Sequence, residues 1–407
     1  MNKITHKLLR HLAKQINRPN QPPECESLSL TPKRFDYYFN LSIKERLGVH
    51  EELQALFDQS SSAKLIYSPS GFGEVERIDL VEITDPYEFL KLSGESCLYE
   101  LVESACNALS KLSVSHEWLQ SIIDKSIIDW RRGVQAFGVK PRDVTRLIDS
   151  IQLLDWVEGN NRVALPDIRT LSVKLFHDSK RVESITGTIA RIYESQLPEH
   201  LQGSSADEVM DYIGLSKFAP MIRLKGDFDI ILQEGRINCA DIIPYLGLPP
   251  DVIEDIQTKS SPAYLLFIEN ATTFNRYTRE IQDNGWVVYT NGFPSRSWTP
   301  VFRSLATQAG VTTPIFHWGD VDIGGYRILM HMQAILNIDI KPFRMLPEVG
   351  QGTGSKSISI RSLRSTLHGT ESESIKELEM LLEKLEEKSD FVPWVEQEQL
   401  DLKSPVE

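Results

Sequence analysis

The chain has 407 residues, of which 41% are hydrophobic and 25% are charged, a composition that is ordinary for a folded protein and allows two to four domains. No run of eighteen apolar residues occurs and no apolar segment follows the basic start of the chain, so we expect neither a transmembrane helix nor a secretory signal. The four cysteines form no Cys-x-x-Cys pair, which argues against a zinc site or a disulfide framework and favours a reduced, cytoplasmic protein without membrane contact.

The net charge of −13 is unevenly distributed along the chain. Residues 371–407 hold twelve acidic and four basic side chains, a net −8, which leaves −5 for the other 370 residues. Residues 1–50 hold nine Lys and Arg against four Asp and Glu, a local +5. Because local patches decide where a polyanion binds, the acidic total does not exclude a nucleic-acid partner.

The first 92 residues combine helical and extended patterns. Apolar residues at helical spacing predict helices over residues 4–16 and 43–57. Two extended runs around Ser-Pro-Ser-Gly-Phe-Gly, within residues 63–85, predict a β-hairpin. Helices followed by a hairpin favour a small winged-helix-like domain over residues 1–92, and a small α+β packing domain fits the same pattern.

The middle of the chain carries helical patterns and one basic stretch. Three helices are expected between residues 97 and 157, with breaks near Ser113 and Gly138, and they suggest an arm or a dimer surface. The stretch from 171 to 194 contains Lys180 and Arg181. Such a run is typical of a solvated helix face, and a DNA-contacting face is the competing interpretation because Lys and Arg neutralise phosphates.

The last 150 residues alternate between apolar runs and helical patterns. Strands are predicted at 263–270, 285–292 and 313–322, and helices at 272–282, 297–310 and 325–336. This alternation indicates βαβ units and a parallel sheet covered on both faces. Ligands of such sheets bind beyond the carboxyl ends of the strands. The polar residues that follow the three strands should therefore meet at one edge: Glu269, Asn270, Asn291, Gly292, Asp320 and Asp322.

Three of these residues are carboxylates, and they suggest a metal site. Glu269, Asp320 and Asp322 offer only oxygen ligands, which magnesium or manganese prefers, and a cation would relieve their mutual repulsion. Phosphoryl transfer is the natural reaction of such a site. Glu269 serves as a ligand or as the general base, and an Asp-x-Asp motif alone is also common as a loop cap. We expect Gly292, Gly324 and Gly325 to provide backbone turns.

The segments "FIENATTF", "YTNGFPS" and "FHWGDVDIGGYRIL" together resemble the Toprim fold. The narrower form Trp-Gly-Asp-x-Asp-x-x-Gly is similar to the JetD family, the nuclease subunits of Wadjet anti-plasmid systems. The resemblance runs from about residue 140 to 400 and includes Glu396, Gln397 and Glu398 near the end of the chain. Gly324 is a departure, because the family usually has a histidine there.

The resemblance implies a specific activity and specific partners. It places the metal on Glu269, Asp320 and Asp322, with Glu348 as a further candidate ligand and with Asn270, Glu396 and Glu398 as candidates for orienting the ligands. It implies a homodimer that cleaves double-stranded plasmid DNA together with an SMC-like ATPase, a kleisin and a small winged-helix subunit.

Residues 350–357 imitate a phosphate-binding P-loop, but Ser355 separates the glycine from the lysine that the motif requires adjacent. The surrounding residues 341–370 hold five basic side chains and one acidic side chain. A plain flexible loop and a DNA contact are equally consistent with this pattern. For the second interpretation the candidates are Lys356, Arg361 and Arg364.

Taken together, the sequence predicts a multi-domain α/β and α+β protein. The expected parts are a winged-helix-like domain (1–92), a helical arm (93–160), a second winged-helix-like domain (161–255) and a Toprim domain with a helical tail (256–407). The predicted function is metal-dependent DNA cleavage by hydrolysis. Two alternatives stay open, namely a topoisomerase-like cleavage through a tyrosine and a non-catalytic DNA-binding subunit. Cleavage through a tyrosine is expected to use a pair of tyrosines near an arginine. No such pair occurs here, since the candidate tyrosines are isolated in the sequence: Tyr193, Tyr212 and Tyr245.

Overall fold

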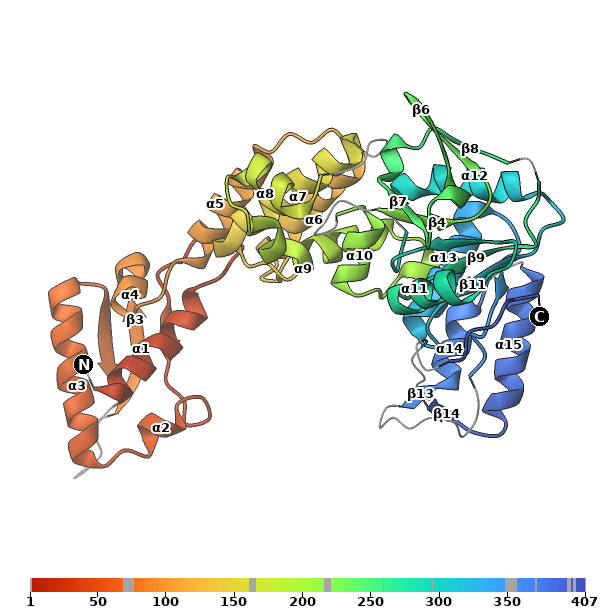
Figure 1. Ribbon diagram of the computed structural model, residues 1–407. Coiled ribbons are helices and arrows are strands. Elements are labelled where there is room, and N and C mark those ends of the chain that lie inside the picture. The colour runs from red at the N-terminus through yellow and green to blue at the C-terminus, as the bar shows by residue number, and fades with distance from the viewer. Residues whose placement is uncertain are drawn as a thin grey trace. The chain divides into compact units, whose positions relative to one another are not determined.

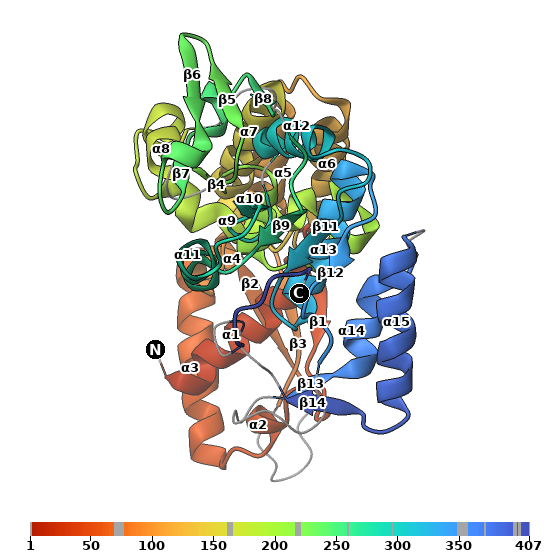
Figure 2. The same ribbon diagram turned by 45° about the vertical axis from the view of Figure 1, so that its right-hand side comes forward.

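The structure is a computed structural model, and it divides into two compact units, Met1–Ile151 and Gln152–Glu407 (Figures 1 and 2). The structure describes residues 2–68, 77–160, 166–215, 221–258, 260–294, 296–347, 357–369, 372–393, 397 and 400–406.

The N-terminal unit begins with a helix, a strand, two helices and two further strands. In chain order these are α1 (Lys3–Ile16), β1 (Ser27–Ser29), α2 (Asp36–Phe39), α3 (Ile43–Ser60), β2 (Ala63–Tyr67) and β3 (Ile78–Ile83). Strand β3 lies between β1 and β2, and both pairings are antiparallel. The predicted helices and hairpin strands are confirmed, whereas residues 69–76 of the predicted turn lie outside the described residues.

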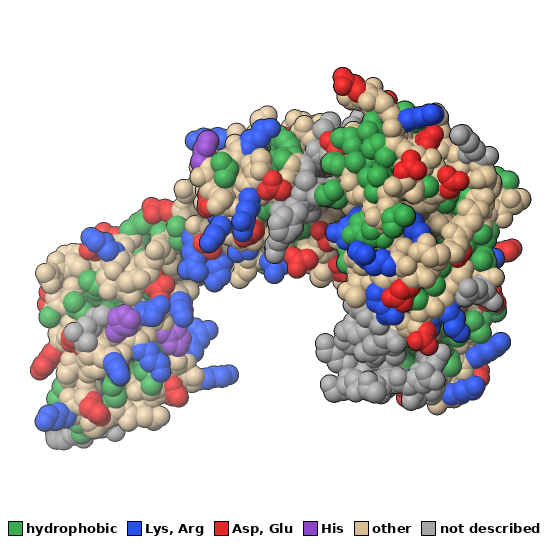
Figure 3. All heavy atoms as spheres, in the orientation of Figure 1, with side chains coloured by type: hydrophobic (Ala, Val, Ile, Leu, Met, Phe, Trp, Pro, Cys, Tyr) green, Lys and Arg blue, Asp and Glu red, His purple; other side chains and the backbone are tan. Residues whose placement is uncertain are grey.

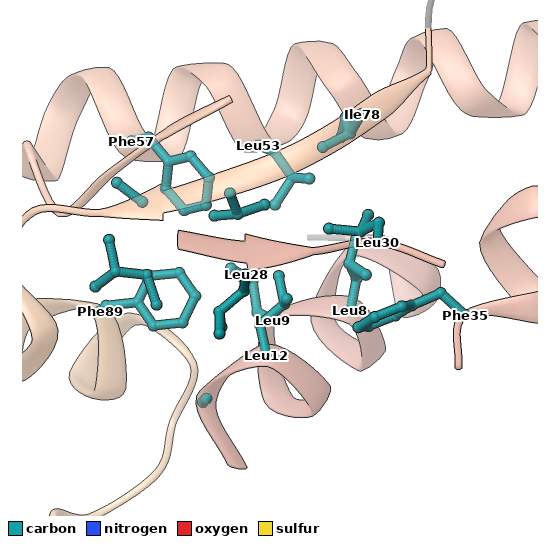
Figure 4. Close-up of a cluster of buried hydrophobic side chains, with 14 of the residues drawn as sticks. Leu8, Leu9, Leu12, Leu28, Leu30, Phe35, Leu53, Phe57, Ile78 and Phe89 are labelled. Carbon is teal, nitrogen blue, oxygen red and sulfur yellow. The ribbon is translucent and has the colours of Figure 1, made fainter. Parts of the chain in front are cut away.

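Local caps and an apolar core explain why these residues form these elements. The side chain of Asn2 accepts a hydrogen bond from the Ile4 N–H at the start of α1, and Ser42 and Glu45 form a capping box at α3. Apolar side chains from α1, α3 and the sheet then pack together (Figure 4). This cluster includes Leu8, Leu9, Leu12, Leu28, Leu30, Phe35, Leu53, Phe57, Ile78 and Phe89.

Helices continue the chain after this core. They are α4 (Pro86–Leu92), α5 (Leu98–Ser110), α6 (Glu117–Arg131) and α7 (Val144–Gly159). The three helices expected between residues 97 and 157 are confirmed, and the breaks near Ser113 and Gly138 are confirmed with them. The buried indole of Trp130 donates to the Val139 carbonyl oxygen (2.9 Å), which holds the second break against α6. Helix α7 crosses the boundary between the two units.

The C-terminal unit mixes helices and short strands before its main sheet. Its first elements are α8 (Ile168–Phe176), α9 (Arg181–Tyr193), α10 (Ala206–Tyr212), β4 (Ile222–Lys225), β5 (Asp229–Leu232), β6 (Gly235–Asn238), β7 (Leu246–Leu248) and β8 (Asp255–Gln257). Strands β6, β5 and β8 form a small antiparallel sheet. Short 3₁₀ turns in the chain are η1 (Pro141–Asp143), η2 (Glu194–Gln196), η3 (Glu199–Leu201), η4 (Cys239–Asp241), η5 (Pro250–Val252) and η6 (Arg296–Trp298).

The main sheet has the order β12-β11-β9-β10-β4-β7. Its later elements are β9 (Tyr264–Ile268), α11 (Ala271–Glu280), β10 (Gly285–Tyr289), α12 (Thr299–Ala309), β11 (Ile315–Trp318), α13 (Ile323–Leu336) and β12 (Lys341–Pro342). Every residue of β9 and β10 is buried, as the continuous apolar runs predict.

The three predicted strands are parallel as expected, but the sheet as a whole is mixed. Strands β12, β11, β9 and β10 are parallel, but β4 pairs antiparallel with β10, and β7 pairs antiparallel with β4. Two short strands from before residue 256 therefore complete the sheet. The mixed α/β class is confirmed, and the four domain boundaries stay a prediction.

The chain ends in a helical pair with a small sheet (Figure 2). Its elements are β13 (Ser357–Ser359), α14 (Ile360–Leu367), α15 (Glu373–Glu386) and β14 (Phe391–Pro393), and the two strands pair antiparallel. Ile375, Leu378 and Leu382 of α15 are buried, so the apolar stripe of the tail helix docks within its own unit. Among the described residues, no helix has the length and apolar character needed to cross a membrane.

Candidate catalytic site

The parallel register of β9 and β11 brings two carboxylates together. Trp318 lies opposite Ile268, so Gly319 and Glu269 follow side by side at the carboxyl ends of these strands. The Glu269 backbone N–H donates to the Trp318 carbonyl oxygen (3.0 Å), and the Asp320 N–H donates to Oε2 of Glu269 (3.2 Å). The predicted convergence of Glu269 and Asp320 is therefore found in the structure.

A glutamine from the end of the chain links the same two strand ends. The Gln397 side chain is buried, its Nε2 donates to the Trp318 carbonyl oxygen (2.8 Å), and its Oε1 accepts from the Asn270 N–H (3.1 Å). Sequence reasoning placed Gln397 in a C-terminal motif without giving it a role. The side chain of Asn270 caps α11 by accepting from the N–H groups of Thr272 and Thr273, so its predicted role at the site stays untested.

Asp322 does not continue the strand, contrary to the expectation of an extended Asp-x-Asp. Strand β11 ends at Trp318, and Asp322 is the N-cap of α13, where its Oδ1 accepts from the Gly325 N–H (2.8 Å). Aspartate is favoured at this position because its carboxylate satisfies helix N–H groups and interacts with the helix dipole. The loop from 319 to 322 thus directs Asp320 toward Glu269 and Asp322 toward the start of α13.

The glycines of this region have different roles. Gly292 has a φ of +75° after Asn291 with a φ of +55°, so the predicted turn there is confirmed. Neither Gly324 nor Gly325 has a positive φ, and the predicted sharp turn at this pair is wrong. Gly325 is required for another reason, because a Cβ atom there would collide with the backbone carbonyl of Asp320.

A fourth carboxylate, Glu208 of α10, lies at the same helix start. A Cβ atom added to Gly324 would lie 3.2 Å from Oδ1 of Asp322 and 3.6 Å from Oε1 of Glu208. The capping box with Ser205 fixes the other oxygen of Glu208, and Arg327 of α13 donates to the carbonyl oxygens of residues 202 and 203 (3.1 and 3.2 Å). Sequence reasoning missed Glu208, since its only signal was a Ser-x-x-Glu cap far from the strand ends.

The neighbouring carboxylates act on Glu269. Burial, the charge of Asp320 and the charges of Asp322 and Glu208 raise the pKa of Glu269 to about 8, although the hydrogen bond from the Asp320 N–H opposes the shift. A bound cation would therefore favour the ionised form of Glu269.

His317 lies beside this group within β11. It is fully buried, and burial lowers its pKa to about 3, so the ring is neutral. A Cβ atom added to Gly319 would lie 2.8 Å from Nε2 of His317 and 2.8 Å from Oε2 of Glu269. Among the residues that the structure describes, neither ring nitrogen has a hydrogen-bond partner.

The chemistry of these residues fits a hard divalent cation. Within the described part of the chain, no three His, Cys, Asp or Glu side chains already form a closed metal-binding group. Magnesium does not need such a group, because it binds through one or two carboxylates and keeps waters that phosphate oxygens replace. Glu269 and Asp320 are carboxylates of this kind at adjacent strand ends.

The predicted DNA-binding residues of this unit come from two separate stretches of the sequence and differ in their surroundings. Lys180 and Arg361 are exposed, and Arg181 is half-buried at the first position of α9. The Arg364 guanidinium lies 3.0 Å from Glu386 and 3.3 Å from Glu383, so α15 already neutralises part of its charge. Their DNA contacts stay predictions, and four predicted residues lie outside the described residues: Glu348, Lys356, Glu396 and Glu398.

Two comparisons with known proteins bear on this site. Residues 247–406 match the family model of the Wadjet protein JetD, C-terminal. The chain is also 24% identical over 180 residues to the Wadjet protein JetD of Bacillus cereus (strain Q1). This match covers 44% of the chain and 43% of that relative, which is less than half of the relative's length. The matched family region contains Glu269, Asp320 and Asp322 and all of β9 to α15. Over residues 247–406 the chain is therefore similar to the C-terminal region of Wadjet JetD proteins.

Proposed function

We propose that the chain is a magnesium-dependent DNA endonuclease that cleaves plasmid DNA as the nuclease subunit of a Wadjet-type defence system. The observation that carries the proposal is the pair formed by Glu269 and Asp320 at adjacent ends of parallel strands. Asp322 and Glu208 extend the negative charge to the start of α13. The JetD-like sequence around these residues supports DNA as the substrate.

We also propose Toprim and winged-helix assignments for the two ends of the chain. The parallel strands β9, β10 and β11, with carboxylates after the first and last of them, support the Toprim assignment. The helix-strand-helix-helix-strand-strand order of residues 3–83, with β3 between β1 and β2, supports a winged helix.

Glu269, Asp320 and Asp322 would hold the magnesium or manganese ion. When bound, the ion polarises a phosphodiester group and lowers the pKa of a coordinated water. Glu269 is also a candidate general base, because a bound ion would lower its metal-free pKa of about 8 and leave the carboxylate ionised and able to accept a proton. The Asp322 cap holds the loop against α13, and the Asp320 N–H holds the Glu269 carboxylate in place.

Hydrolysis by water is favoured over cleavage through a tyrosine. The Tyr193 side chain is buried, and its hydroxyl donates to Oε1 of Glu158 (2.9 Å). A tyrosine nucleophile must reach the phosphate and must be activated by a base or a cation. Tyr193 does not meet the first requirement in this structure, because its side chain is buried. The acid groups at the strand ends likewise argue against a non-catalytic subunit.

The partners follow from the same proposal. A duplex has two strands, so a homodimer would present one acid site to each strand. The ATPase, kleisin and small winged-helix subunits of a Wadjet system would deliver the plasmid.

Plasmid cleavage with and without divalent ions tests the proposal. Supercoiled plasmid is incubated with the full chain, alone and with the other subunits, in magnesium, manganese or EDTA. We expect nicked or linear products only with a metal ion, and no product with Asp320→Asn. Asp241→Asn, an exposed position of the same unit, is the matched control. Cleavage by Asp320→Asn at the unmodified rate, or an uncut plasmid under every condition, contradicts the proposal.

A further inference from the structure

Helix α1 of the N-terminal unit has a basic exposed side. Its fourteen residues include four Lys or Arg and two His, and they include no Asp or Glu. The opposite side of the helix is apolar and packs into the core (Figure 4). Lys3, Lys7, Arg10 and Lys14 are exposed, and Figure 3 shows Lys, Arg and His side chains gathered where α1 lies at the surface.

Two of these side chains, Lys7 and Lys14, form a compact group with His11 of the same helix and with Arg34, and we call this group the basic face. Tyr37 lies at its centre. The Lys7 ammonium is 3.9 Å from the centroid of the Tyr37 ring, and Nδ1 of His11 is 3.4 Å from the Tyr37 hydroxyl. The Arg34 guanidinium donates to Oε1 of Gln15 (3.2 Å), which holds it beside the helix. The cations are therefore positioned by the fold.

The charge of the basic face is not neutralised within the unit. Arg10 and Arg18 at its edge pair with Glu95 and Glu26 (2.7 and 3.1 Å). In contrast, Lys7, Lys14 and Arg34 make no ion pair with any residue that the structure describes. Burial, followed by the charges of Lys14, Lys7 and Arg34, lowers the pKa of His11. Asp36 is the acid in this neighbourhood, and its charge acts on Tyr37. Such crowding of like charge is unfavourable until an anionic partner binds.

A sugar–phosphate backbone suits this surface better than an acidic protein does. Protein interfaces need an apolar centre, and none of the large apolar side chains of residues 2–42 is exposed. Lys7 and Lys14 are separated by about 10 Å along the helix axis, from the rise of 1.5 Å per residue. Two cations spaced along a helix can contact successive phosphates, and long flexible cations bind phosphates without reading bases.

The neighbouring helix is unsuited to the same task. In a winged helix, the helix before the hairpin usually enters the major groove. Here that helix is α3, which carries four acidic and two basic residues, with Arg46 of the latter buried. An acidic helix is repelled by phosphates.

We propose that the basic face of α1 binds the sugar–phosphate backbone of duplex DNA and that α3 does not contact the duplex. The choice of DNA as the polyanion rests on the proposed function, whereas the location of the face rests on the N-terminal unit alone. Binding there should be independent of base sequence and sensitive to salt.

Lysine footprinting and salt-dependent binding test the proposal. The full chain is acetylated with and without a 30-base-pair duplex in EDTA, so that cleavage is not required, and each lysine is quantified by mass spectrometry. We expect protection of Lys7 and Lys14 and no protection of Lys44 and Lys64, which are exposed on α3 and β2.

The triple variant Lys7→Gln, Lys14→Gln, Arg34→Gln should bind the duplex at least tenfold more weakly. Its slope of log affinity against log salt should fall by about 2.7, since each lost contact contributes about 0.9.

The matched control removes three exposed lysines elsewhere in the same unit, with Lys44→Gln, Lys64→Gln and Lys91→Gln. It should leave both the affinity and the slope nearly unchanged. Circular dichroism checks that both triple variants fold. Unchanged binding by the basic-face variant, or equal protection of Lys44 and Lys64, overturns the proposal. Equal protection of Lys7 and Lys14 by poly-L-glutamate at the same charge concentration also overturns it, because a protein partner would then fit as well. The binding experiments do not depend on cleavage. If the chain fails to cleave plasmid in the test of the proposed function, protection and affinity still show whether the basic face binds DNA.

Discussion

The N-terminal unit gathers cations on an exposed helix face, whereas the C-terminal unit gathers carboxylates at the ends of buried strands. The cations of α1 lie at the surface, and burial together with the charges of Lys14, Lys7 and Arg34 lowers the pKa of His11. The carboxylates lie half-buried, and burial together with mutual repulsion moves the pKa of Glu269 to about 8. Exposed cations spread over a helix therefore suit an extended polyanion. Half-buried carboxylates at adjacent strand ends suit a small cation that reduces their repulsion.

The largest expected effect separates cleavage from binding. Glu269→Gln should reduce plasmid cleavage by about 10² to 10⁴-fold, the range that loss of a positioned proton acceptor produces. Duplex binding in EDTA should stay within twofold, because the substitution removes no cation. Cleavage assays and fluorescence anisotropy on one preparation measure both quantities. Parallel loss of binding and cleavage contradicts the separation of roles between the two regions.

Some parts of the candidate site could be predicted from the sequence and others could not, for physical reasons. The strand ends carrying Glu269 and Asp320 were predictable, because apolar runs of strand length alternate with helical periods and parallel strands end at one edge. Glu208 and Gln397 were not predictable, because each reaches the site through packing of a distant element. The antiparallel β4 and β7 were missed since strands of four and three residues leave no periodic signal.

The second prediction concerns the close approach of backbones at the acid site. Gly325→Ala places a Cβ atom against the Asp320 carbonyl and should lower the free energy of unfolding by about 1 to 3 kcal/mol, a typical overpacking cost. Gly187→Ala in α9 is the control, because a Cβ atom there meets nothing within 4 Å. It should stabilise the protein by about 0.5 to 1 kcal/mol. Denaturant unfolding of both variants measures the contrast, and equal stabilities would show that the loop yields without cost.

The third prediction concerns the link made by Gln397. Gln397→Met keeps the volume but removes both hydrogen bonds, and it should cost about 1 to 3 kcal/mol because the Asn270 N–H loses its acceptor. Cleavage should need more magnesium, since Glu269 and Asp320 lose a support for their relative position. A magnesium titration of cleavage distinguishes this positioning role from general instability. Gln59→Met, at an exposed position of α3, is the control and should change neither quantity.

The last prediction is a pH dependence of stability that has opposite signs in the two regions. In the metal-free protein, Glu269 has a folded pKa near 8 against an ordinary value of 4.5, so the folded state binds the extra proton. Its contribution to stability is full below pH 4.5 and is lost as the pH rises toward 8. Asp211, whose pKa is raised to about 6 by burial and by the charges of Asp207 and Glu208, acts in the same direction.

His11 behaves in the opposite way because its pKa is lowered from 6.5 in the folded state, and buried His50 shares this direction. Their contribution to stability is full above pH 6.5 and is lost as the pH falls below that value.

Hydrogen exchange of peptides from each unit, corrected for intrinsic rates, measures both trends in one protein. Acidification from pH 7 to 5.5 should loosen α1, and alkalinisation from pH 5.5 to 8 should loosen β9 and β11. Glu269→Gln should abolish much of the alkaline trend and leave the acid trend of α1 unchanged. Magnesium should suppress the alkaline trend as well, because a bound cation stabilises the ionised carboxylate that repulsion and burial otherwise disfavour.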